Sequence, residues 1–242
     1  MRSRMLELYL GNISFVFLAL RIAVLCLIAT GASAQQISDR PSWQLGGFAA
    51  GGFTPDYEIQ GILNYTEEDK FFSAGMETGR MLAAAHGRGL LRGRPEAVIE
   101  VIPYWEVDEP KQTDTVYFAG SNVPFTGVFA GYKEHGISVT PLMFRWNLMH
   151  HDSSRFVPWA QAGLGLLWTT QNFPQGTGLP GGNTSSINFL PQIGIGESIF
   201  VRKRQSLDFG VRGIHVTDAG LGEYNHVINA IVQFTVGYSW WK

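Results

Sequence analysis

Apolar and polar residues alternate along most of the chain with the period of two that is typical of β-strands. The last such segment, 227–241, has apolar residues such as Val232 and Phe234 at even positions and polar residues such as Gln233 and Thr235 at odd positions. Successive strand side chains point to opposite faces, so each segment has one apolar and one polar face. The pattern predicts eight strands, at 42–53, 70–85, 95–108, 136–148, 156–170, 185–200, 206–218 and 227–241.

The polar faces of these segments carry charged residues. Glu96, Glu100 and Glu106 alternate with apolar residues in the segment 95–108, and unpaired carboxylates are too costly for the dry core of a soluble protein. We therefore expect the apolar faces to point outward into lipid, and Glu100, Glu106 and Arg145 to pair with one another in the interior. The even number of strands and the aromatic residues near their ends fit this arrangement. The sequence predicts an all-β fold, an eight-stranded antiparallel transmembrane β-barrel.

Alternation alone also fits a soluble β-sandwich or a lipocalin-like barrel, in which the apolar faces would point inward. The strand count is open by one hairpin, because the region 111–135 is less regular than the rest. Segments 116–120 and 127–132 could pair there as an extra hairpin, or the region could be a long surface loop.

Residues 1–34 have the pattern of an export signal. Basic residues precede an interrupted apolar run, and Ala32-Ser33-Ala34 fits a cleavage site of small residues. The only cysteine, Cys26, lies within this segment. We therefore expect the signal to be removed, leaving a single cysteine-free barrel domain, 35–242, in the bacterial outer membrane.

Charge and residue spacing argue against nucleic acid and a metal ion as partners. The net charge is −2 and 16% of the residues are charged, whereas a nucleic-acid surface normally calls for a basic patch. We expect the cluster Arg202-Lys203-Arg204 to be a solvated turn. His150 and His151 are adjacent and would point opposite ways in an extended chain, so we expect no metal site there.

A histidine and a hydroxyl residue lie two positions apart in the segment 206–218. Because side chains alternate, His215 and Thr217 share a face with apolar residues such as Phe209 and Val211. In a barrel with apolar faces outward, this face is in contact with the membrane. A base and a potential nucleophile would then meet a lipid substrate that enters from the side.

The stretch Arg212-Gly213-Ile214-His215-Val216-Thr217-Asp218-Ala219-Gly220-Leu221, together with Gly237-Tyr238-Ser239-Trp240, resembles the C-terminal signature of the lipid A 3-O-deacylase (PagL) family. The family motif typically reads His-x-Ser-Asn-Ala-Gly-Leu. A weaker resemblance extends to 96–105 and 140–147. The resemblance implies an outer-membrane barrel that hydrolyses an ester-linked acyl chain of lipid A in lipopolysaccharide, with no cofactor.

Carried over position by position, the resemblance makes His215 the general base and Thr217 the nucleophile. Asp218 and Gly220 occupy the two positions that stabilise the oxyanion, the latter through its backbone N–H. Counted without gaps, Asn229 falls where the family has its catalytic acid. Thr217, Asp218 and Asn229 differ from the residues of the family pattern.

Each difference alters the chemistry. Threonine keeps the hydroxyl but adds a methyl that crowds the tetrahedral intermediate. A carboxylate at Asp218 opposes the developing negative charge unless it is protonated or turned away. Asn229 can fix the histidine tautomer but cannot stabilise an imidazolium as a carboxylate does. The competing interpretation is a non-catalytic barrel, structural or lipid-binding, whose active site has degenerated.

The direction of Asn229 is a further difficulty. Strict alternation along the segment 227–241 turns this residue toward the barrel interior, away from His215. A one-residue bulge within 229–231 would turn it outward again. Without a bulge, Glu223 or His226 in the preceding turn would be the substitutes.

Overall fold

The protein is described by a computed structural model. It covers residues 42–54, 69–109, 131–149, 154–173, 185–221 and 231–242 with their side chains, and the backbone of the strand residues 57–59, 63–65, 112–117, 124–129 and 227–230. The expected signal at 1–34, including Cys26, lies outside the described residues, as do His150 and His151. No helix in the described ranges is long and apolar enough to cross a membrane.

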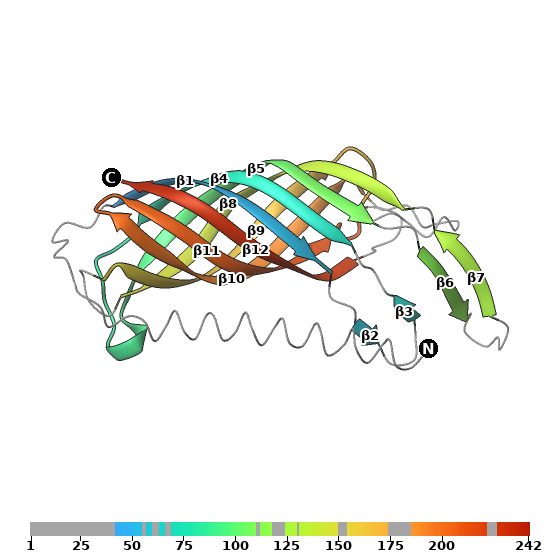
Figure 1. Ribbon diagram of the computed structural model, residues 1–242, viewed down its shortest axis with the longest axis horizontal. Helices are drawn as coiled ribbons and strands as arrows, with labels where there is room; N and C mark the ends of the chain where they lie inside the picture. Colours follow the sequence, from blue (N-terminus) through green and yellow to red (C-terminus); the bar gives the residue numbers. More distant parts are fainter. Residues whose placement is uncertain are drawn as a thin grey trace.

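Eight strands close into an antiparallel barrel, in the order β1-β12-β11-β10-β9-β8-β5-β4 (Figure 1). Each strand pairs with its neighbours along the chain, and β1 pairs with β12 to close the wall. The predicted fold class is therefore confirmed. The strands are β1 (Trp43–Phe53), β4 (Lys70–Met81), β5 (Gly93–Glu109), β8 (Tyr132–Leu148), β9 (Phe156–Thr169), β10 (Ile187–Arg202), β11 (Gln205–Thr217) and β12 (Val227–Trp241).

Two small hairpins lie outside the barrel wall. β6 (Gln112–Tyr117) pairs with β7 (Pro124–Phe129), so the irregular region forms the extra hairpin rather than a long loop. β2 (Tyr57–Ile59) and β3 (Leu63–Tyr65) form a second hairpin that the alternation pattern did not predict. Each of these strands has only three residues, too few to show a period of two.

The two ends of the barrel differ in the length of their connections. The chain passes from β10 to β11 through a tight turn at one end, where the C-terminus also lies (Figure 1). Connections that include the two hairpins lie at the other end. Outer-membrane barrels have short periplasmic turns and longer extracellular loops. We therefore call these the periplasmic and the outer end.

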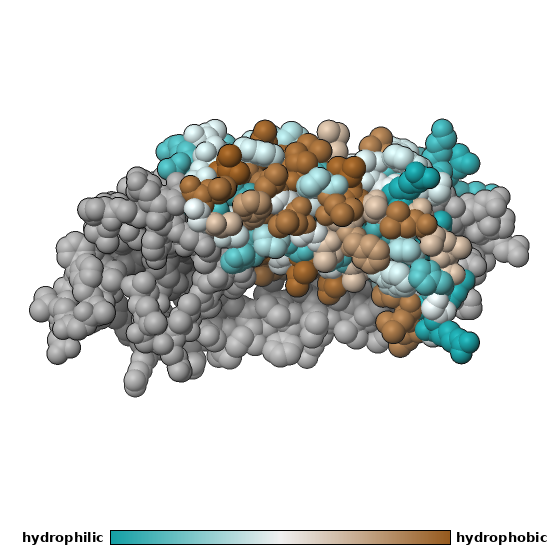
Figure 2. Space-filling model, turned by 180° about the vertical axis from the view of Figure 1, so that it is seen from behind, coloured by the Kyte–Doolittle hydropathy of each residue, from teal (hydrophilic) through white to brown (hydrophobic). Residues whose placement is uncertain are grey.

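The outer wall is apolar, as the alternation predicted. Leu142, Ile193 and Ile195 are 66%, 67% and 60% exposed although they lie in the middle of the sheet. Figure 2 shows hydrophobic side chains gathered along the barrel wall, with hydrophilic ones toward the periplasmic end. An apolar outer wall around a polar interior is the pattern of a barrel that crosses the outer membrane, so the soluble alternatives are wrong.

The barrel interior contains many charged and polar side chains, and several of them pair with one another. Arg145 forms a two-pronged pair with Glu77, at 2.7 Å between Nη2 and Oε2, and its Nε donates to Gln161 at 2.9 Å. Arg212 lies 2.6 Å from Glu100. Arg145 is therefore inside as expected, but its main partner is Glu77, and Glu100 pairs with Arg212 instead.

Glu106 does not lie in the interior, so that prediction is wrong. Ile102 pairs with Ser138 and Trp105 pairs with Gly136, which leaves two residues of β5 opposite one residue of β8. This bulge includes Pro103, which has no N–H for the strand ladder. Beyond it the parity reverses. Trp105 is buried inside, whereas Glu106 faces outward and lies beside Lys133 at 3.7 Å.

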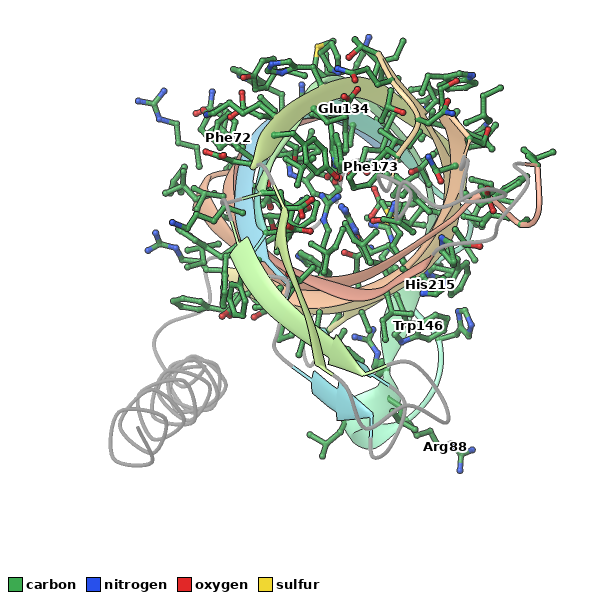
Figure 3. All side chains as sticks on the ribbon, turned by 90° about the vertical axis from the view of Figure 1, so that its right-hand side faces the viewer. Phe72, Arg88, Glu134, Trp146, Phe173 and His215 are labelled. Carbon is green, nitrogen blue, oxygen red and sulfur yellow. The ribbon has the colours of Figure 1, made fainter. Side chains whose placement is uncertain are left out.

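An apolar cluster closes the interior toward the outer end. The chain after β9 folds back into the barrel, where Phe173 is fully buried and its ring lies 5.2 Å from that of Trp105. Glu134 holds this segment by accepting hydrogen bonds from the Thr170 hydroxyl at 2.7 Å and the Gln171 N–H at 2.9 Å. Figure 3 shows Phe173 and Glu134 within the ring of strands. Because these side chains pack the interior, we look for a candidate active site on the outer wall and in the loops.

Candidate active site

His215 and Thr217 lie on the outer side of β11, at its outer end. The inward residues next to this pair are Ile214 and Val216, which are 6% and 0% exposed. His215 and Thr217 alternate with them and are half-buried. Figure 3 shows His215 at the outside of the ring of strands. The expectation that this pair faces the membrane side is confirmed.

A bulge lies on β12 opposite His215. Ile214 pairs with Ile231, and Val216 pairs with Ile228, so residues 229 and 230 together stand opposite His215 alone. This is the irregularity within 229–231 that the sequence required if Asn229 is to turn outward. The side chain of Asn229 lies outside the described residues, as do Glu223 and His226.

The turn that follows β11 has an unusual backbone. Ala219 has φ of 52°, the only positive value of a residue other than glycine among those described, and Gly220 follows with φ of 81°. A left-handed alanine costs about 1–2 kcal/mol relative to the ordinary helical region. Strain of this kind persists only where surrounding contacts hold it, and it often occurs at functional sites.

Two side chains of the motif hold this turn. The N–H of Ala219 donates to Thr217 Oγ1 at 3.1 Å, and the N–H of Gly220 donates to Asp218 Oδ1 at 2.9 Å. The N–H of Leu221 donates to the Asp218 carbonyl at 3.0 Å. Asp218 itself is fully buried. The carboxylate therefore holds the same N–H that the family resemblance assigns to the oxyanion.

The described neighbours of the pair include exposed apolar side chains. Nothing lies within 4 Å of the place that a side chain at Gly220 would occupy. Ile193 of β10 pairs with Gly213 and is 67% exposed, and Phe189 of β10 pairs with Thr217. Leu221, in the turn after β11, is 60% exposed. Apolar side chains of this kind favour contact with the acyl chain of a lipid.

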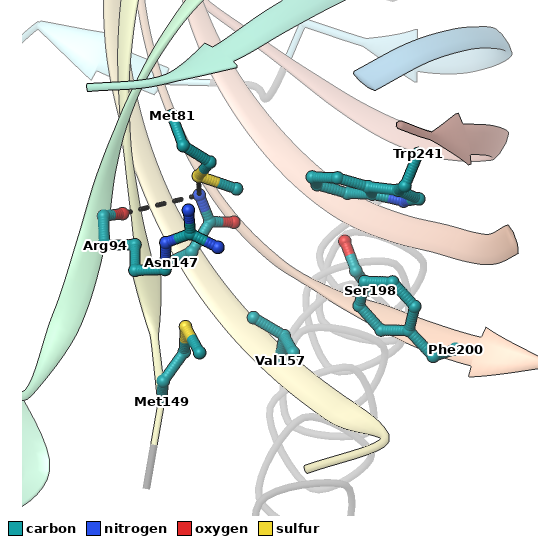
Figure 4. Close-up of a pocket in the computed structure, with 8 residues that line it drawn as sticks. All are labelled: Met81, Arg94, Asn147, Met149, Val157, Ser198, Phe200 and Trp241. Atoms are coloured by element: carbon teal, nitrogen blue, oxygen red, sulfur yellow. Dashed lines mark hydrogen bonds between the residues drawn. The ribbon is translucent and has the colours of Figure 1, made fainter. Parts of the chain in front are cut away.

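Two cavities among the described interior residues are each about 20 Å³, too small for a lipid substrate. One of them lies at the periplasmic end, lined by Met81, Asn147 and Trp241 among others (Figure 4). That volume holds about one water molecule. In the described part of the chain, no group of three or more His, Cys, Asp or Glu residues could hold a metal ion.

The sequence did not predict the role of Ala219. The motif places an alanine there, but no local pattern indicates that its backbone must be left-handed, because alanine prefers other conformations. The hydrogen bond from Gly220 to Asp218 was likewise not predicted, although Asp and Asn side chains commonly bond the backbone N–H two residues on. That general tendency is the signal in the sequence from which the bond between Gly220 and Asp218 could have been predicted.

Comparison with known proteins places these residues in a family. The model of the family "Lipid A 3-O-deacylase (PagL)" matches residues 101–239, more than half of the chain. The crystal structure of the outer membrane enzyme PagL is 19% identical and has a TM-score of 0.47, with 80% of this chain and 97% of that chain covered.

The beta domain of the Bordetella autotransporter BrkA is 10% identical and has a TM-score of 0.27, with 84% and 99% covered. No curated protein matches the chain. The family match includes β11, the turn that follows it and nearly all of β12. The chain belongs to the lipid A 3-O-deacylase (PagL) family.

Proposed function

We propose that this barrel is an outer-membrane hydrolase that removes an ester-linked acyl chain from lipid A of lipopolysaccharide. One observation carries the proposal: a histidine and a hydroxyl residue two positions apart lie on the lipid side of β11, beside a strained turn. The family membership supplies the reaction class. The apolar surface around the pair suits acyl chains, and the site lies at the outer end of the barrel.

In the proposed reaction, His215 accepts the proton of the Thr217 hydroxyl while Thr217 Oγ1 attacks the ester carbonyl carbon. Thr217 Oγ1 already accepts the N–H of Ala219, so its own hydrogen is the one passed to the base. The tetrahedral intermediate collapses when His215 returns the proton to the departing sugar oxygen. Water then attacks the acyl-threonine with His215 again as base, which releases the fatty acid.

Asn229 is proposed as the residue that orients His215. An amide oxygen can accept the Nδ1–H of the imidazole and so fix the tautomer in which Nε2 takes the proton from Thr217. The bulge on β12 opposite His215 supports this role, because it interrupts the strict alternation that would turn residue 229 inward. Asn229→Leu is then expected to lower kcat while leaving the barrel folded.

The oxyanion is proposed to be received by the N–H of Gly220. In the observed turn that N–H is held by Asp218, so the carboxylate must turn away or be protonated before the donor can serve the intermediate. This requirement predicts a slow enzyme compared with one that has a neutral residue at position 218.

The direct test uses the purified, refolded barrel with lipopolysaccharide in detergent, with lipid A followed by mass spectrometry. We expect loss of one hydroxyacyl chain in the unchanged protein and none in His215→Ala. Gln205→Ala, at the other end of β11, is the matched control and should keep full activity. Equal release by the His215→Ala protein, or no release across a range of pH, ions and detergents, would overturn the proposal.

The second candidate is a non-catalytic barrel that keeps the lipid contact of the family. The hydrogen bond between Gly220 and Asp218 favours it, because the donor expected at the oxyanion is occupied by a carboxylate. A protein that binds lipopolysaccharide without deacylating it, and in which Thr217→Ser and Asp218→Asn together restore no activity, would fit this candidate.

We also propose that residues 1–34 are removed during export, and that 35–242 form the mature domain. Mass spectrometry of the protein isolated from outer membranes should give an N-terminus near Gln35. A mature protein that still contains Cys26 would contradict this boundary.

A further inference from the structure

The turn between β4 and β5 is much longer than the β10–β11 turn at the same end of the barrel. It runs from Leu82 to Arg92, includes the short 3-10 helix η2 (Gly89–Leu91), and extends sideways from the barrel in both Figure 1 and Figure 3. Figure 3 looks along the barrel and shows Arg88 well outside the ring of strands. The turn therefore extends parallel to the membrane plane instead of continuing along the barrel axis into the periplasm.

Contacts with the outer wall fix the height of this turn. The Nε1–H of Trp146 donates to the Leu91 carbonyl at 3.3 Å, and the His86 ring packs edge-on against the Trp146 ring, with centroids 4.9 Å apart. Trp146 lies near the periplasmic end of β8, where aromatic residues mark the boundary between hydrocarbon and headgroups. The turn therefore lies at that boundary.

The turn is held in place rather than loosely attached. His86 and Gly93 exchange two backbone hydrogen bonds of 3.0 Å each. Arg92 Nη1 donates to the Met149 carbonyl at 3.1 Å, which ties the turn to the end of β8. Its exposed side chains are therefore presented in one orientation.

The exposed side chains are of two kinds. Leu82, Leu90 and Leu91 are 58%, 77% and 74% exposed, so one short turn carries three exposed large apolar side chains. Arg88 is exposed among them, and the stretch 82–95 contains arginines but no acidic residue. Figure 2 shows hydrophobic and hydrophilic atoms side by side on this protrusion, at the lower right.

We propose that the β4–β5 turn is a lipid-binding element that inserts its leucines at the periplasmic membrane boundary and binds the phosphate of anionic phospholipids with Arg88. Leucines with cationic neighbours are the composition of segments that lie in the interface of an anionic membrane. The guanidinium forms two-pronged hydrogen bonds with phosphate oxygens. The element fixes the height and rotation of the barrel in the membrane, and it is independent of the proposed hydrolase activity.

The test places a fluorescent probe in the turn of the whole chain. Cys26→Ser removes the only native cysteine, and Ala84→Cys then carries a nitrobenzoxadiazole label in lipid nanodiscs. Spin-labelled phosphatidylglycerol and spin-labelled phosphatidylcholine are compared as quenchers at equal mole fraction. Iodide is the aqueous quencher, and Lys203→Cys in the β10–β11 turn is the matched site at the same end of the barrel.

We expect lipid quenching at position 84 and little iodide quenching, with the reverse at position 203. Phosphatidylglycerol should quench position 84 more strongly than phosphatidylcholine, and Arg88→Gln should lower that ratio by about fivefold, the effect of one arginine near an anionic surface. Leu90→Ser with Leu91→Ser should expose the label to iodide. Heat-modifiable migration in gels checks that each variant is folded.

Iodide quenching at position 84 equal to that at position 203 would overturn membrane insertion. Equal quenching of position 84 by phosphatidylglycerol and phosphatidylcholine would overturn the phosphate contact. So would a quenching ratio of the two lipids that Arg88→Gln leaves unchanged. Neither result depends on whether the protein deacylates lipid A.

Discussion

The backbone N–H of Gly220 donates a hydrogen bond to the carboxylate of Asp218 across 2.9 Å. The two residues lie in the strained turn directly after the strand that carries His215 and Thr217. A fully buried carboxylate thus holds the backbone donor that the proposed reaction needs. This single contact connects the structure of the turn with the expected rate of the enzyme.

Replacement of Asp218 by asparagine is expected to raise the rate of deacylation. The neutral amide oxygen accepts the N–H of Gly220 more weakly than a carboxylate does, so it gives up this donor to the oxyanion more readily, and the negative charge near the developing oxyanion is lost. One oxyanion donor is worth about 10²–10³ in kcat, so we expect a gain of at least about tenfold. Initial rates of acyl release measure it. An unchanged or lower rate would argue that Asp218 does not compete for the donor.

Replacement of Thr217 by serine is expected to raise kcat with little change in KM. The hydroxyl stays in place, while loss of the methyl relieves crowding of the tetrahedral intermediate. Misplacement of a reacting atom can lower the rate of the chemical step by up to about a hundredfold, so we expect kcat to rise by no more than this factor. Thr217→Val is the matched control, because it keeps the shape and removes the nucleophile. Activity that survives in Thr217→Val would exclude this residue as the nucleophile.

Gly220→Ala tests the left-handed turn. A side chain at this position meets no atom within 4 Å, so the cost comes only from φ of 81°, about 1–2 kcal/mol. We expect reduced acyl release from a barrel that still migrates as folded in heat-modifiability gels. Gly51→Ala is the control, since it also has open space and no positive φ. Equal activity of the two variants would show that the turn geometry is not needed.

Arg145→Ala is expected to destabilise the barrel strongly. It removes the partner of Glu77 and leaves buried carboxylates uncompensated, which costs about 3–5 kcal/mol. Urea titration of the refolded protein in vesicles measures the loss. Lys133→Ala breaks an exposed pair on the outer wall and should change stability little. Similar midpoints for the two variants would contradict the role assigned to the interior network.

The unchanged barrel is expected to conduct no ions. Phe173 and Trp105 close the interior toward the outer end, and the paired side chains around Arg145 fill the middle. Planar bilayer recordings test this expectation. Stable single-channel steps from the purified protein would show that the filled interior opens in the membrane.

Much of the wall could be predicted from the alternation of residues. The segment 227–241 was predicted with the bounds that β12 has, and 156–170 differs from β9 by one residue. Such strands cross a membrane, so one face must be apolar over many positions and the period is clear. The hairpin of β2 and β3 gave no comparable pattern, because its strands are too short.

The errors came from places where the period is interrupted. The bulge at Pro103 reverses the parity of β5, and this moved Glu106 from the predicted interior to the outer wall. A residue without an N–H indicates a possible irregularity, but the position of the extra residue depends on how β5 pairs with β4 and β8. The partners of Arg145 were wrong for a different reason: they come from strands that are distant in the sequence, so alternation within one strand does not indicate them.

The sequence by itself determined that this protein is a barrel with an apolar outer wall, because charged residues lie on the polar faces of segments that alternate with a period of two. The same period places His215 and Thr217 on that wall. Only the tertiary structure decided three further things: the bulge opposite His215, the left-handed turn at Ala219, and the bond between Gly220 and Asp218. These depend on the pairing of β11 with β12 and on the path of the chain between them. The sequence offers only a general tendency for the bond, since Asp side chains commonly accept the N–H two residues on, and the neighbouring strands and turn set the backbone at the other two places.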